Sequence, residues 1–131
     1  MPNVFISYAR ADQQNVEQLV RALRAADIHG WLDATDIAAG ASVSSEVREA
    51  LRRSSAVIVF LSHSALHNQW VQFEIGAAEA LGKAIIPVIV SGNQLEQEFP
   101  DILKGRNVID ARDRPYPTVI NEISQALKHS Q

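Results

Sequence analysis

The sequence predicts an α/β fold built on one parallel sheet with helices on both faces. Short apolar, β-branched segments alternate along the chain with longer segments whose apolar residues recur every three or four positions. The strand-like segments at 55–62 and 84–90 are apolar almost throughout, as in strands that are buried on both faces. Since strands that alternate with helices form parallel sheets, a doubly wound α/β domain is expected.

The expected elements follow one another without a repeat, a low-complexity tract or a linker, so residues 1–131 are taken as a single domain. Strands are expected at 3–8, 28–33, 55–62, 84–90 and 107–111, and helices at 12–27, 45–54, 69–82 and 117–129. Five strands of this kind suit a flavodoxin-like sheet with the order 2-1-3-4-5.

Three of the helices are predicted from the spacing of their apolar residues. These residues are Val16, Leu19, Val20 and Leu23 in the first helix, Val47, Ala50 and Leu51 in the second, and Val119, Ile123 and Leu127 in the last. Asp12 is placed to cap the first helix, and Pro117 suits the first turn of the last. Residues 63–68 are expected to form a polar loop, and 91–106 a short helix broken by Pro100.

Composition excludes several classes of function. Hydrophobic residues make up 47% and charged residues 21%, and the net charge of −3 argues against nucleic acid as a direct partner. Without cysteine the chain has no disulfide, thiolate metal site or cysteine nucleophile. The longest apolar run, 84–90, is far too short to span a membrane, and no basic segment precedes an apolar one at the start. A cytoplasmic protein without a membrane partner is therefore expected.

The segment 69–82 carries a carboxylate in an unusual place. At about 100° per residue, Glu74 falls roughly 40° from Trp70, on the apolar side of the helix, whereas Gln72 and Glu79 form the polar face. In doubly wound sheets ligands bind beyond the carboxyl ends of the strands, where the strand order reverses. That point is bordered by 7–12 and 62–69. Glu74 is therefore expected either to line a crevice there or to be an ordinary glutamate that snorkels or pairs with an arginine.

Several ordered motifs then show a resemblance to a known family. The segments "VFISYARAD", "WLDATDIAAGASVSSEVREAL", "AVIVFLSHSALHNQWVQFEIGAA" and "AIIPVIV" resemble the successive strand, loop and helix motifs of a TIR (Toll/interleukin-1 receptor) domain of the bacterial, NAD⁺-cleaving type, over essentially the whole length. The resemblance implies a flavodoxin-like fold and cleavage of the nicotinamide–ribose bond of NAD⁺. NAD⁺ would be the substrate, so no bound cofactor is expected. The products would be nicotinamide and either ADP-ribose or a cyclic isomer.

The resemblance also implies roles for single residues. Glu74 matches the catalytic glutamate, and the implied substrate-binding residues are Tyr8, Ala9, Arg10, Asp33 and Trp70. The BB loop, residues 34–42, would meet a neighbouring copy during self-association through Asp36, Ile37, Gly40 and Ser42. Ser42 departs from the aromatic residue that some active relatives carry there. The alternative for Trp70 is a side chain that packs in the core, and the alternative for Arg10 is a side chain exposed to solvent.

Two alternatives to cleavage of NAD⁺ stay open. A non-catalytic adaptor would bind other TIR domains through the same loop, and a nucleoside deoxyribosyltransferase-type enzyme would also use a glutamate on sugar chemistry. The resemblance implies bacterial immune signalling, antiphage defence in particular, or a host-targeting effector, and the chain suits an N-terminal domain of a longer sensor. His63 and His67 have a spacing that chelates metals on a helix, but the segment supplies no third ligand, so no metal site is expected.

Overall fold

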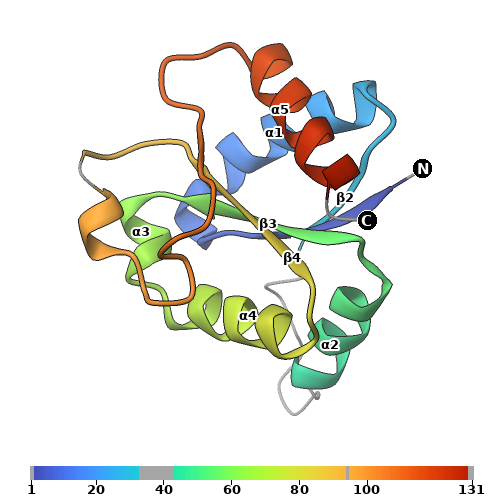
Figure 1. Cartoon of the computed structure of the whole chain (residues 1–131), viewed down its shortest axis with the longest axis vertical. Helices are drawn as coiled ribbons and strands as arrows, with labels where there is room; N and C mark the ends of the chain where they lie inside the picture. The colour runs from blue at the N-terminus through green and yellow to red at the C-terminus, as the bar shows by residue number, and fades with distance from the viewer. Residues whose placement is uncertain (1, 33–42, 94, 130–131) are drawn as a thin grey trace.

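Figure 1 shows the chain as a computed structural model, which describes residues 2–32, 43–93 and 95–129. The elements, in chain order, are β1 (Asn3–Ser7), η1 (Arg10–Asp12), α1 (Gln13–Ala25), β2 (His29–Leu32), α2 (Val43–Arg53), β3 (Ala56–Leu61), α3 (His63–Leu66), α4 (Gln69–Ala80), β4 (Ala84–Ile89), η2 (Leu95–Glu98), β5 (Ile109–Asp110) and α5 (Tyr116–His129). The strands form one sheet in the order β2-β1-β3-β4-β5, and every neighbouring pair is parallel. The predicted flavodoxin-like order is therefore confirmed.

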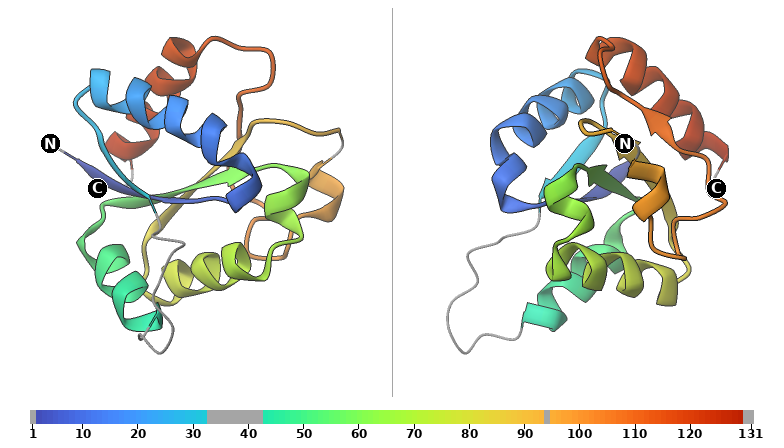
Figure 2. Two further views of the ribbon diagram at one scale, coloured as in Figure 1. Left: turned by 180° about the vertical axis from the view of Figure 1, so that it is seen from behind. Right: turned by 90° about the vertical axis from the view of Figure 1, so that its left-hand side faces the viewer.

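Helices cover both faces of the sheet, α1 and α5 on one and α2, α3 and α4 on the other (Figures 1 and 2). Successive strand residues point to opposite faces, so β3 gives Ala56, Ile58 and Phe60 to one core and Val57, Val59 and Leu61 to the other. All six side chains are fully buried, which explains why this strand reads as a continuous apolar run. The apolar faces predicted for α1 and α5 are buried as expected.

The segment that follows β3 is helical, although a polar loop was predicted there. Ser62 precedes α3 in extended conformation, and its Oγ accepts a hydrogen bond from the backbone N–H of Ala65. Ala65 and Leu66 are buried in the core beneath. A cap and two buried apolar residues therefore hold a single turn that is too short to show a periodic pattern.

The remaining differences concern the ends of elements. Asp12 occupies the N-cap position of α1, but its side chain makes no capping hydrogen bond to the helix, contrary to prediction. The fifth strand is limited to Ile109–Asp110, shorter than the predicted 107–111. In the described part of the segment 91–106 the chain forms the short helix η2, which ends before Pro100 as expected. Among the described residues, no helix is long and apolar enough to cross a membrane.

A network of charged side chains lies at the end of β5. The carboxylate of Asp110 accepts hydrogen bonds from the backbone N–H and the guanidinium of Arg112, and the Arg112 side chain also donates to the carbonyl of Gly92. The hydrogen bond from the Arg112 side chain is the main reason why the pKa of Asp110 is lowered to about 2. The network joins the end of β5 to the loop after β4.

Candidate functional site

The candidate site is built around a hydrogen bond between β1 and α4. Ser7 ends β1, and its hydroxyl donates to Oε1 of Glu74 over 2.7 Å. Both residues are fully buried. Burial of a carboxylate is costly unless polar groups replace its water. The hydroxyl of Ser7, 67 positions away in the sequence, is one such group.

The alternation of β1 explains why Ser7 meets Glu74. Val4 and Ile6 point into the core under α1 and α5, while Phe5 packs in the core under α2 and α4. Ser7 is two residues after Phe5, so its side chain points to the α4 face. Since Ser7 is also the last residue of the strand, the contact lies at the carboxyl edge of the sheet, where ligands bind in this fold.

The structure refines the expected place of Glu74. It lies in the second turn of α4 at the predicted edge, but its exposed fraction is 0%, so it does not line an open crevice. Its Oε1 accepts a hydrogen bond from Ser7 and its Oε2 is shielded from solvent as well, so the side chain does not snorkel to the surface. The helix that carries it begins with a cap, in which the side chain of Asn68 accepts from the N–H of Val71.

A second contact joins the two loops that border this edge. The hydroxyl of Ser62, after β3, donates to the carboxylate of Asp12, after β1. This bond takes the Asp12 side chain away from the helix cap that the sequence indicates, and links residues 50 positions apart. The loops predicted to border the site, 7–12 and 62–69, are therefore tied together at the point where the strand order reverses.

The other predicted residues divide between core and surface. The Tyr8 side chain is buried in the core under α1 and α5, on the opposite face from Glu74, and Ala9 is buried on the Glu74 side. Arg10 is exposed in η1. Trp70 is half-buried and stacks on Phe73, with ring centroids 5.3 Å apart. Contact of these four residues with a substrate stays a prediction.

The remaining predicted residues, Asp33, Asp36, Ile37, Gly40 and Ser42, lie outside the described part of the chain. Sequence reasoning missed the partnership of Ser7 with Glu74 and that of Asp12 with Ser62. For Ser7 a signal existed, because the period of two along β1 places it on the same face as Phe5, the face that α4 covers.

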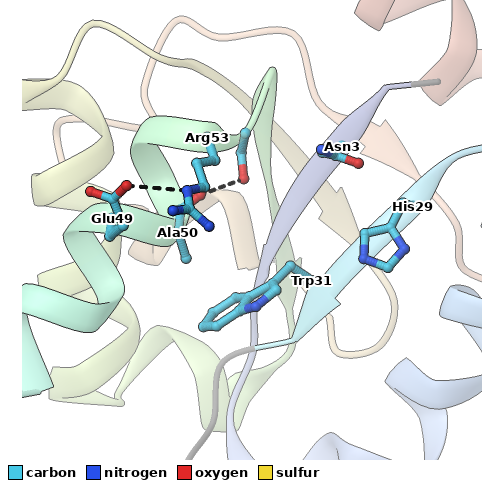
Figure 3. A pocket seen from close by; sticks show the side chains of 7 residues that line it. Asn3, His29, Trp31, Glu49, Ala50 and Arg53 are labelled. Atoms are coloured by element: carbon cyan, nitrogen blue, oxygen red, sulfur yellow. Dashed lines mark hydrogen bonds and ion pairs between the residues drawn. The ribbon is translucent and has the colours of Figure 1, made fainter.

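A separate cavity of about 470 Å³ lies elsewhere on the molecule. Figure 3 shows its lining, in which Trp31 of β2 faces Ala50 and Arg53 of α2. Asn3 and His29, which begin β1 and β2, also line it, so it opens at the amino edge of these strands. Trp31 also stacks on Phe5 of the neighbouring strand. Glu74 does not line this cavity, so the cavity is separate from the candidate site.

Comparisons with known proteins agree with the fold. The sequence profile of the family described as TIR domain matches residues 4–129. The TIR domain of the Toll-related receptor TRR-2 from Hydra magnipapillata has a TM-score of 0.76 and 19% identity, covering 98% of this chain and 99% of that one. A 2-desoxiribosyltransferase from Leishmania mexicana has a TM-score of 0.66 and 16% identity, covering 98% and 99%. These identities show a shared fold alone.

One curated protein is similar in sequence. It is named NAD(+) hydrolase TcpC, comes from Escherichia coli, and is 33% identical over 72 residues, which are 54% of this chain and 24% of that protein. The match therefore spans about a quarter of that relative's length. The fold alone does not separate a TIR domain from a deoxyribosyltransferase, but the profile match does. Because that match covers nearly the whole sequence, this chain belongs to the TIR domain family.

Proposed function

We propose that this chain cleaves the nicotinamide–ribose bond of NAD⁺, with Glu74 as the catalytic carboxylate. The observation that carries the proposal is a buried carboxylate at the ligand edge of the sheet, held by the hydroxyl of Ser7. The sequence similarity to a protein named as an NAD(+) hydrolase supports the substrate.

The chemistry needs a carboxylate in this setting. Departure of neutral nicotinamide leaves positive charge on the ribose, in an oxocarbenium-like transition state. A negative charge fixed nearby in a water-poor site stabilises that charge far more than it would in water. The nicotinamide ring leaves as a neutral group and needs no proton, so one carboxylate suffices. The Ser7 hydroxyl donates to Oε1 of Glu74 and so helps to orient the carboxylate toward the edge of the sheet.

Access to Glu74 requires a rearrangement, because the side chain is fully buried in the single chain. We propose that self-association provides it, and that the BB loop contributes to the contact. A partner that binds the open form better than the closed form shifts the population toward the open form. The proposed biological setting is bacterial immune signalling. The product released beside nicotinamide would be ADP-ribose or a cyclic isomer of it.

The test compares Glu74→Gln with Glu79→Gln. The first change removes the charge but keeps the size and an acceptor for Ser7, and the second makes the same change on the exposed face of the same helix. Nicotinamide release by clustered protein should fall at least about 100-fold in Glu74→Gln and stay near wild type in Glu79→Gln. Circular dichroism verifies that both variants are folded, and mass spectrometry of the second product separates ADP-ribose from a cyclic isomer.

Unchanged turnover in a folded Glu74→Gln variant would rule out the proposed role. If wild-type protein shows no turnover at any concentration, the non-catalytic adaptor becomes the better assignment. Binding to a second TIR domain, measured without NAD⁺, would then be its expected activity.

A further inference from the structure

Two histidines and a glutamate come together at the carboxyl edge, on elements that are distant in sequence. His63 begins α3 and His67 follows it four residues later, so both side chains lie on the same side of one helical turn. Glu98 ends η2. Its Oε2 lies 3.7 Å from Nδ1 of His63, and its Oε1 lies 3.5 Å from Nε2 of His67. Sequence reasoning found no third ligand for these histidines, because Glu98 is 31 residues beyond His67.

Buried neighbours hold both elements in place. Ala65 and Leu66 anchor α3, while Leu95 and Phe99 anchor η2 on the same core. Gly92 allows the loop after β4 to approach closely, since a Cβ there would lie 3.2 Å from Cδ2 of His63. Figure 1 and the left view of Figure 2 show α3 next to the segment of η2. The fold therefore places the backbone segments that carry the three polar groups next to one another.

The spacing of the three residues is close to that of a zinc site. One ligand atom of each residue can be chosen so that all three lie within 4.8 Å of one another. Tetrahedral Zn²⁺ binds imidazole nitrogen and carboxylate oxygen at about 2.0–2.2 Å, which places ligand atoms about 3.3–3.5 Å apart. Small side-chain rotations of these exposed residues would close the difference.

We propose that His63, His67 and Glu98 form a binding site for Zn²⁺ or a similar transition metal, with a fourth position open to water. Two imidazoles select such a metal over Mg²⁺ or Ca²⁺, which prefer oxygen ligands. The metal would clamp η2 to α3. Since Ser62, directly before α3, is bonded to Asp12, the clamp adjoins the loops that border Glu74. The proposal does not depend on the NAD⁺-cleaving activity.

The experiment is calorimetric titration of the full chain, freed of any histidine tag, with Zn²⁺ alone. One equivalent is expected to bind. His63→Ala, His67→Ala and Glu98→Gln should each weaken binding by about tenfold or more, because each removes a ligand. His29→Ala is the matched control, since His29 is exposed on β2, away from the cluster, and should leave the affinity unchanged.

A second measurement separates loss of metal from loss of fold. Zn²⁺ should raise the unfolding temperature of wild type and of His29→Ala, but not that of the double variant His63→Ala/His67→Ala. All three ligands are exposed, so the variants should unfold at the wild-type temperature without metal. Absence of Zn²⁺ binding, equal binding by the double variant, or equal binding of Mg²⁺ would overturn the proposal.

Discussion

At the residue scale, the contact between Ser7 and Glu74 has two consequences. It lies between fully buried groups, so its loss leaves a polar group in the core without that partner. It also fixes the carboxylate at the end of the strand where the fold binds ligands. The same bond therefore contributes to stability and to the orientation of the proposed catalytic group.

Ser7→Ala is predicted to lower the free energy of unfolding by about 1.5–3 kcal/mol, the range for a hydrogen bond to a charged group. Ser54→Ala is the matched control. Ser54 is also buried, but its hydroxyl donates to a neutral acceptor, the carbonyl of Ala50, so a loss of about 0.5–1.5 kcal/mol is expected. Urea denaturation of both variants gives the comparison.

A repeat of Ser7→Ala in the Glu74→Gln background completes the test. If the charge is the reason for the larger loss, the effect of Ser7→Ala should shrink there toward the Ser54→Ala value. If Ser7→Ala lowers the free energy of unfolding equally in the two backgrounds, the effect does not depend on the charge of Glu74. That result would contradict a charge-assisted hydrogen bond that orients the carboxylate.

Sequence reasoning reached the place of Glu74 but not its environment. Helical spacing put this residue on the apolar side of its helix, and the buried positions Val71, Ile75 and Ala78 around it confirm that. Its burial could not be predicted, because it depends on which strand residue faces α4 and on what covers the edge. Those are properties of packing between segments 67 positions apart.

At the scale of an element, α4 joins the site to the rest of the fold. Asn68 caps its start, Glu74 lies in its second turn, and Gly82 follows its end. Gly82 has a φ of +70°, the left-handed conformation that commonly ends helices. Gly76 lies inside the helix, and a Cβ at either glycine would meet no atom within 4 Å. The two glycines therefore differ in backbone conformation and not in available space.

Opposite effects of alanine are predicted at these positions. Gly76→Ala should stabilise the protein by about 0.5–1 kcal/mol, because alanine favours the helix and glycine does not. Gly82→Ala should destabilise it by about 1 kcal/mol, because alanine is strained at positive φ. Thermal and urea unfolding of the two variants measures both. Stabilisation by both substitutions would mean that the helix does not end at Gly82 as described.

Elements with a repeated pattern were predictable, and those held by single contacts were not. The strand β3 and the helices α1 and α5 show their burial directly in the spacing of apolar residues. The single turn α3 depends on the cap from Ser62 and on the buried Ala65 and Leu66, which no periodicity reveals. Its misassignment as a loop also concealed the cluster of His63 and His67 with Glu98.

At the scale of the whole molecule, two loops that follow neighbouring strands are joined at the edge of the sheet where the candidate site lies. The bond from Ser62 to Asp12 joins these loops, and the bond from Ser7 to Glu74 joins the sheet to α4. In this closed arrangement Glu74 has no exposed surface. A substrate can reach it only in a conformation in which part of the surrounding structure has moved.

If assembly stabilises that open conformation, the rate of NAD⁺ cleavage per chain must depend on chain concentration. We predict that the rate per chain rises by roughly tenfold or more when the chains are clustered, a typical size for coupling between sites. Nicotinamide release is measured across a dilution series, and again with the chain fused to an inducible dimerising domain, with and without the inducer. Glu74→Gln, clustered in the same way, gives the background. A rate per chain that stays constant throughout would show that the single chain opens by itself, and that self-association does not control the reaction.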